Sequence, residues 1–250
     1  MLLTIDVGNT NTVFGVFDGE KMLDSWRIKS DARTTADELA LELRGLLRGI
    51  EVTGIAACST VPAILREIRR MLERYYADLP TVLIQPGVRT GVGIAVDNPK
   101  EVGADRIMNT LAAHHLFGGP VIVVDFGTAT NFDIVSERGE FAGSVLAPGI
   151  EISVDALAAG AAQLVKVELV RPPTVIGKNT VTSLQSGIIY GFAGQVDGLV
   201  RRIVGELGAR ATVVATGGLA PLVLDVSETI QFHEPDLTLI GLRLAWELNT

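Results

Sequence analysis

The chain has 250 residues, enough for one large domain or two small ones, each with a buried core. Hydrophobic residues make up 48% of it and charged residues 20%, which excludes a disordered or fibrous chain and fits an α/β protein. The formal net charge of −8, without any block rich in Lys and Arg, argues against nucleic acid as a partner and means that anionic ligands need local donors.

We expect neither a signal peptide nor a membrane span at the start of the sequence. It lacks a basic region, and its apolar run is too short for a signal peptide or a membrane span, so we expect a cytoplasmic protein without a membrane partner. A single cysteine, Cys58, excludes an intramolecular disulfide and a Cys-rich zinc site. Because Cys58 follows an apolar run, we expect it to be buried at the end of a strand.

An internal repeat relates residues 5–20 to residues 124–140. Each copy has a β-rich run ending in Asp-x-Gly, a short turn of Asn and Thr, and a second β-rich run. A Gly turn then leads to a third strand, at residues 22–28 in one copy and 141–146 in the other.

Each copy continues with a helix and a further strand. Thr35 and Glu38 form a capping box that opens the first of these helices. The expected segments are helices at residues 35–47 and 152–162 and strands at residues 54–58 and 212–216. The economical interpretation is two βββαβα units, with an N-terminal half at residues 1–118 and a C-terminal half at residues 119–250.

The other expected helices lie outside this shared pattern. They are a Pro62-initiated helix to about Tyr75, a helix after Arg106 to about Phe117, a long helix at residues 180–207 and a final helix at residues 236–249. The long helix has an apolar face that favours a role in packing or in a homodimer interface.

The two Asp-x-Gly turns are the strongest functional signal. Glycine lets the backbone approach a phosphate, and the neighbouring Asn and Thr side chains add donors. Asp6 and Asp125, at the strand ends, can hold a cation or its water shell against that phosphate. We expect the two turns to face a nucleotide cleft, with Thr216-Gly217-Gly218 admitting the adenine or ribose.

Two other phosphate-binding motifs are only partly matched by the sequence and are excluded. Residues 177–180 contain the Gly-Lys pair of a Walker A loop, but Pro172 replaces its first glycine and Asn179 its Ser or Thr. Residues 125–127 spell the Asp-Phe-Gly of protein kinases, yet the other kinase motifs are missing from the sequence.

Asp105 is the candidate catalytic residue, because it follows a Gly-containing loop at the mouth of a helix. It could accept a hydrogen bond from a substrate hydroxyl while Arg106 pairs with a substrate carboxylate. An ordinary helix-terminal Asp is the alternative. We expect the helix N–H groups and Arg106 to keep the pKa of Asp105 low.

An ordered set of motifs resembles the type III pantothenate kinases, also called the Bvg accessory factor family. It comprises residues 6–10, 98–99, 103–106, 125–130, 148–149, 177–180 and 216–218, spread over nearly the whole chain. One departure is Val96, where many members have an aromatic residue.

The resemblance implies a duplicated actin-like (ribonuclease H-like) fold, a homodimer, and phosphorylation of pantothenate by ATP with magnesium. It implies ATP contacts at Asp6, Val7, Gly8, Asn9, Thr10, Asn11, Thr12, Val13 and Thr128, and pantothenate contacts at Gly103, Ala104, Asp105, Arg106 and Thr180. It further implies that Asp105 is the proton acceptor and that Asp125 binds a monovalent cation, potassium or ammonium.

Two other hypotheses about function remain open at this point. One keeps the fold but changes the acceptor to a sugar or another small hydroxylated substrate, because a fold does not define a substrate. The other is a nucleotide-binding regulatory protein that has lost turnover. The presence of Asp6, Asp105, Arg106 and Asp125 argues against the second.

Overall fold

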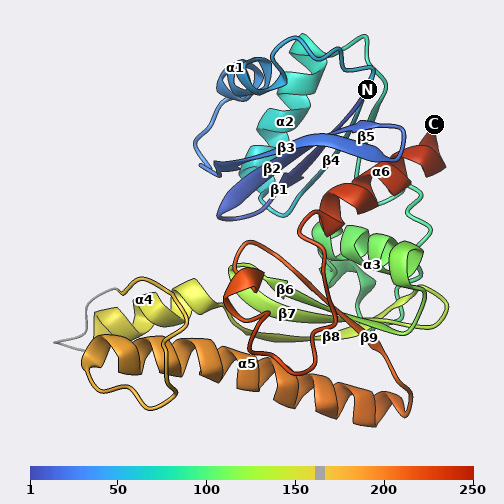
Figure 1. Cartoon of the computed structure of the whole chain (residues 1–250). Helices are drawn as coiled ribbons and strands as arrows, with labels where there is room; N and C mark the ends of the chain where they lie inside the picture. Colours follow the sequence, from blue (N-terminus) through green and yellow to red (C-terminus); the bar gives the residue numbers. More distant parts are fainter. Residues whose placement is uncertain (161–166) are drawn as a thin grey trace. The chain divides into compact units, whose positions relative to one another are not determined.

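A computed structural model describes residues 1–160 and 167–250, and these form two compact units (Figure 1). The first unit contains Met1–Gly93, Asp97–Ala112 and Asp236–Thr250, and the second contains Ile94–Val96 and Ala113–Pro235. These units differ from the expected halves chiefly at the C-terminus, because the final helix packs in the first unit. None of the helices in the described residues is both long and apolar enough to cross a membrane.

The first unit is built on a five-stranded sheet with the order β3-β2-β1-β4-β5. Its strands are β1 (Leu2–Val7), β2 (Asn11–Asp18), β3 (Lys21–Lys29), β4 (Gly54–Ser59) and β5 (Thr81–Leu83). β1 runs antiparallel to β2 and parallel to β4. The ends of β1 and β4 therefore meet at one edge of the sheet.

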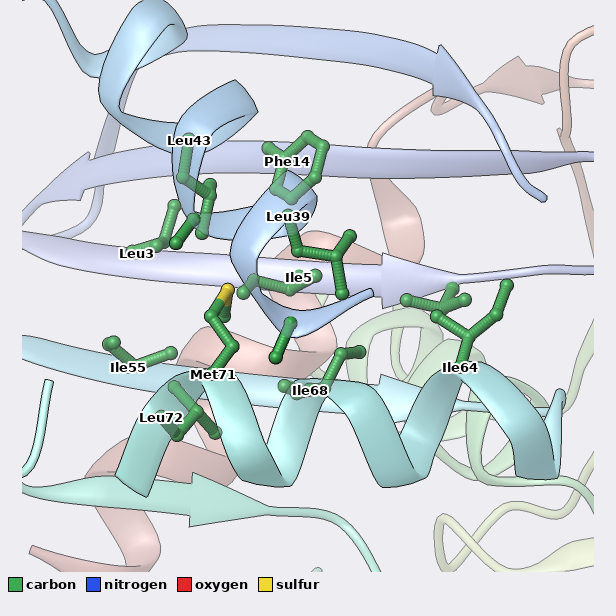
Figure 2. Packing of buried hydrophobic residues seen from close by; sticks show 14 of the residues in the cluster. Leu3, Ile5, Phe14, Leu39, Leu43, Ile55, Ile64, Ile68, Met71 and Leu72 are labelled. Carbon is green, nitrogen blue, oxygen red and sulfur yellow. The ribbon is translucent and has the colours of Figure 1, made fainter. Parts of the chain in front are cut away.

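One face of this sheet is covered by α1 (Ala36–Leu47) and α2 (Pro62–Tyr75). The predicted capping box is present, since the Thr35 hydroxyl accepts from Glu38 N and the Glu38 carboxylate accepts from Thr35 N. Figure 2 shows the core beneath the helices, which includes Leu3, Ile5, Phe14, Leu39, Leu43, Ile55, Ile64, Ile68, Met71 and Leu72. This face is a hydrophobic core and leaves the opposite face for other elements.

The opposite face carries α6 (Leu237–Asn249) and the first part of α3 (Ala104–Phe117). Met108 of α3 and Leu242 of α6 belong to one buried cluster with Cys58 of β4. The two helices cross closely, because a Cβ added at Gly241 would lie 2.1 Å from the Met108 carbonyl oxygen. This packing fixes the N-terminus of α3 relative to the sheet.

The second unit repeats the strand arrangement, in the order β10-β9-β6-β7-β8. Its strands are β6 (Val121–Phe126), β7 (Ala129–Val135), β8 (Phe141–Pro148), β9 (Thr212–Thr216) and β10 (Phe232–His233). β6 runs antiparallel to β7 and parallel to β9, as β1 does to β2 and β4. The predicted duplication of an actin-like βββ core is confirmed.

The helices of the second unit depart from a simple repeat. Both α4 (Ile150–Gly160) and α5 (Thr180–Leu207) precede β9, and a short 3-10 turn, Ala220–Leu222, follows it. The last two residues of the helix expected at 152–162 lie outside the described residues. α5 has the predicted bounds, and its apolar face, with Ile188, Val196 and Val200, packs into the core of its own unit.

Candidate functional site

The turn between β1 and β2 has the tight geometry that the Gly-Asn-Thr sequence predicts. Gly8 N donates to the Asn11 carbonyl oxygen at 3.0 Å, and Asn9 and Thr10 at the tip are exposed. Ser30, directly after β3, holds the turn from one side, because its N–H donates to the Thr10 carbonyl oxygen at 2.9 Å. Residues 6–13 thus form the ends of β1 and β2 and the turn between them, with exposed polar groups at the tip, which suits a phosphate.

Asp6 lies where β1 ends, in a poorly solvated position. The Cys58 thiol, on the paired residue of β4, donates to Asp6 Oδ1 at 3.3 Å. Burial, and next the charge of Asp105, raise the pKa of Asp6 to about 7. The hydrogen bond from Cys58 and the charge of Arg27 lower this pKa, but they do not outweigh burial.

Asp105 lies in the first turn of α3, close enough for its charge to act on Asp6. Its Oδ1 accepts from Arg106 N at 2.9 Å. Burial nevertheless raises the pKa of Asp105, although this hydrogen bond and the charge of Arg106 both lower it. The expectation of a low pKa is therefore wrong, because the loss of hydration outweighs the helix N-terminus. A carboxylate with a raised pKa is a better proton acceptor.

The loop before α3 leaves no room for a side chain at Gly103. A Cβ there would lie 2.5 Å from Asp105 Oδ1 and 3.6 Å from Thr60 Cγ2. Thr60 itself follows β4, and its N–H donates to the Val7 carbonyl oxygen at 3.1 Å. The first unit thus brings together Asp6, the loop at Gly103, Ala104, Asp105 and Arg106, and the end of β4.

Cys58 and Thr60 are site neighbours that the sequence reasoning missed. Cys58 is buried, as expected, but it also contacts Asp6, which its interpretation as a simple core residue did not anticipate. The available signal was the position of both residues at the end of a strand that could lie parallel to β1. The ends of neighbouring parallel strands meet at the edge where α/β proteins place their ligands.

In the second unit, Asp125 ends β6 as Asp6 ends β1. Its partner on the parallel strand is Thr216, and Gly127 N donates to the Ala129 carbonyl oxygen at 3.0 Å. Gly217 has a φ of +89°, and a Cβ there would lie 2.6 Å from Asp125 Oδ1. The positive φ and this close approach to the carboxylate explain why residue 217 is a glycine.

Thr128 and Thr180 are the remaining predicted contact residues. Thr128 is exposed at the tip of the β6–β7 turn, and its carbonyl oxygen would lie 2.2 Å from a Cβ at Gly149. Thr180 is exposed in the first turn of α5, directly after Asn179, whose side chain accepts from Thr182 N at 2.9 Å. Both side chains are therefore accessible to a ligand.

Within the described residues, no three His, Cys, Asp or Glu side chains form a group that could hold a metal ion. These residues therefore offer no all-protein carboxylate cage for a divalent ion. Asp125, near the end of β6 and beside the exposed Gly127 and Thr128, offers a single carboxylate that could hold a monovalent cation.

A family model described as type III pantothenate kinase matches residues 2–202. The chain belongs to the type III pantothenate kinase family. The family member from Frankia alni is 69% identical over 249 residues, covering 100% of both chains. That from Salinispora arenicola is 65% identical over 251 residues with the same coverage. Relatives of this family thus span the chain from end to end.

Solved structures of other proteins share the fold at low sequence identity. An inorganic polyphosphate/ATP-glucomannokinase from Arthrobacter has a TM-score of 0.53 at 14% identity, over 100% of this chain and 99% of that one. Component A of the (R)-2-hydroxyglutaryl-CoA dehydratase from Acidaminococcus fermentans has a TM-score of 0.56 at 15% identity, over 98% and 95%. The family therefore shares its duplicated fold with proteins of different activities.

The raised pKa of Asp6 predicts that Asp6→Asn stabilises the protein at alkaline pH. A carboxyl group whose pKa rises on folding stabilises the fold below its unfolded pKa, 3.8, and this stability is lost as the pH rises through about 7. Above that pH, the free energy of unfolding of the variant should exceed that of the wild type by about 1–4 kcal/mol. Below pH 3.8 the two proteins should be equally stable. Urea unfolding across this range measures it. A difference that does not change with pH would contradict the raised pKa.

Proposed function

We propose that the chain transfers the γ-phosphoryl group of ATP to the 4′-hydroxyl of pantothenate, the first step of coenzyme A synthesis. The observation that carries the proposal is the partly buried Asp105, whose charge raises the pKa of Asp6. The proposed proton acceptor and the proposed phosphate loop therefore both belong to the first unit. Family membership identifies the acceptor class.

In this proposal, Asp105 accepts the proton of the substrate hydroxyl as its oxygen attacks phosphorus. Phosphoryl transfer has a loose transition state, so the residue mainly orients the hydroxyl and takes up its proton late. Arg106 pairs with the pantothenate carboxylate, for which a guanidinium offers two parallel donors. Gly103 and Ala104 place backbone beside the substrate, and Thr180 adds a hydroxyl.

ATP is bound, in the same proposal, by the loop at residues 6–13 and by Thr128. Backbone N–H groups and exposed Asn and Thr side chains offset a protein charge of −8 that opposes the polyphosphate. Magnesium arrives with ATP and neutralises phosphate charge. The cytoplasm, which supplies ATP, is the proposed location.

An assay of ATP consumption tests the acceptor. Pantothenate, pantetheine and common sugars should be compared with the same enzyme preparation, in potassium and in sodium. Turnover with pantothenate is the expected result. Turnover with sugars and none with pantothenate would overturn the proposal and leave the fold unaffected.

Asp105→Asn and Arg106→Ala should produce different kinetic defects. Asp105→Asn keeps the size of the side chain but removes the proton acceptor, so kcat should fall by about 10²- to 10⁴-fold while ATP binding persists. Arg106→Ala should raise the KM for pantothenate, because its proposed partner does not react. Steady-state kinetics measure both. A wild-type kcat in folded Asp105→Asn would reduce Asp105 to a helix-terminal residue.

Potassium dependence should be lost in Asp125→Ala. We propose that this carboxylate holds a monovalent cation, potassium or ammonium, beside the Gly127-Thr128 turn, where it would offset phosphate charge. The variant should use ATP poorly in both potassium and sodium. Asp6→Ala should also lose ATP-dependent activity, but this loss should not be specific to potassium. Rates measured across a potassium titration test this. Intact stimulation in Asp125→Ala would move the cation to another site.

We also propose a homodimer that uses α5. The apolar side of this helix is already covered within its own unit, but its outer side carries Gly187, Gly191, Gly194 and Gly198. A Cβ at any of them would meet nothing within 4 Å. Each glycine inside a helix lowers the stability of the helix by about 1 kcal/mol relative to Ala. Close approach by the backbone of a second copy would explain why glycine occupies these positions.

Gly191→Leu should therefore dissociate the dimer without unfolding the chain. Within a single chain the space around Gly191 is open, so the leucine side chain would not disturb the fold. It would clash only with a second copy packed against α5. Gly45→Leu is the matched control, because Gly45 lies in α1 with equally open surroundings. Sedimentation velocity should show a monomer for Gly191→Leu and a dimer for the control. A dimer in both would remove α5 from the interface.

A further inference from the structure

Arg27 belongs to the same row of the first sheet as Asp6. Strand register pairs Arg27 of β3 with Val13 of β2, and Val13 with Asp6 of β1. Directly paired residues point to the same face of a sheet, and the two strand spacings place Arg27 about 10 Å from Asp6 along the row. A long side chain can cover much of this distance.

The neighbours of Arg27 confirm which face it occupies. Trp26 and Ile28 pack against the core beneath α1 and α2, so Arg27 between them projects from the opposite face. That face is the one on which Cys58 contacts Asp6. Arg27 and the candidate site therefore share a face within a single rigid sheet.

The Arg27 side chain has no polar partner among the described residues. Its side chain is exposed, and it makes no hydrogen bond or ion pair with residues 1–160 or 167–250. Its charge nevertheless reaches the site, since it lowers the pKa of Asp6. Lys29, the next residue on that face, instead lowers the pKa of Asp31. Arg27 is thus an exposed cation on the same face of the sheet as the site, and its charge acts on Asp6.

The site needs such a cation. The protein has a net charge of −8, and Asp6 and Asp105 add two carboxylates beside the place where a phosphoryl group must pass. A triphosphate approaching them is repelled unless donors and positive charge compensate. A guanidinium presents paired N–H donors that match phosphate oxygens, and it stays charged throughout the reaction.

We propose that Arg27 is a further catalytic residue that binds the γ-phosphoryl group of ATP during transfer, an inference that rests on the proposed function. As the substrate oxygen forms its bond to phosphorus, the bond to the ADP oxygen breaks and its electron pair leaves with ADP. The hydroxyl proton passes to Asp105. Arg27 exchanges no proton and stabilises the negative charge on the three oxygens of the phosphoryl group that is transferred.

The test compares Arg27→Gln and Arg27→Lys with Lys21→Gln, which removes an exposed cation from the opposite end of β3. Arg27→Gln should lower kcat/KM for ATP by about 10²- to 10³-fold. Titration calorimetry should show weaker binding of ATP and unchanged binding of ADP, which lacks the group that Arg27 binds. Arg27→Lys should recover part of the loss, and Lys21→Gln should behave as wild type.

The outcomes separate this inference from the proposed function. Equal weakening of ATP and ADP, or no change in either, would overturn the role of Arg27 even if the wild type phosphorylates pantothenate. If the wild type fails to phosphorylate pantothenate, the proposed function falls, but the ATP-against-ADP comparison still decides whether Arg27 binds the γ-phosphoryl group. Urea unfolding of each variant establishes that the fold is intact.

Discussion

Two carboxylates, Asp6 and Asp105, approach each other in a poorly hydrated part of the first unit, and the surrounding structure must hold them there. Burial raises the pKa of both, and the charge of Asp105 raises that of Asp6 further. Such an arrangement opposes folding when both groups are ionised. The fold tolerates it because elements far apart in sequence fix the two residues independently, Asp6 on the central strand and Asp105 on a helix.

The packing around the pair follows from that requirement. The first turn of α3 is held by α6, whose Gly241 lets the two helix backbones cross, and by contacts of Met108 with the sheet. Gly103 leaves space for the Asp105 carboxylate, and Cys58 donates to Asp6. The burial that lowers stability also raises the pKa of Asp105 and so makes it a better proton acceptor. In our proposal, the positive charge of Arg27 offsets the negative charge of the two carboxylates and the phosphate.

Much of the fold could be predicted because local rules agree with it. The capping box at Thr35, the glycine turns and the apolar period of α5 gave the elements and the duplication. The return of α6 to the first unit could not be predicted, since no local pattern says which of two sheets an amphipathic helix covers. The pKa of Asp105 was misjudged for a related reason: the helix terminus is visible in sequence, but burial depends on tertiary packing. Cys58 was missed because its contact needs the β1–β4 register.

The most direct test of the account is a site-resolved titration of Asp6 by NMR of its carboxyl carbon, in the wild type and in Asp105→Asn. We predict an apparent pKa of about 7 in the wild type, far above the ordinary value of 3.8. The pKa should fall in the variant, because one cause of the increase is the charge of Asp105. An Asp6 that titrates near 3.8 in both proteins would contradict the account, since the two carboxylates would then be neither buried nor coupled.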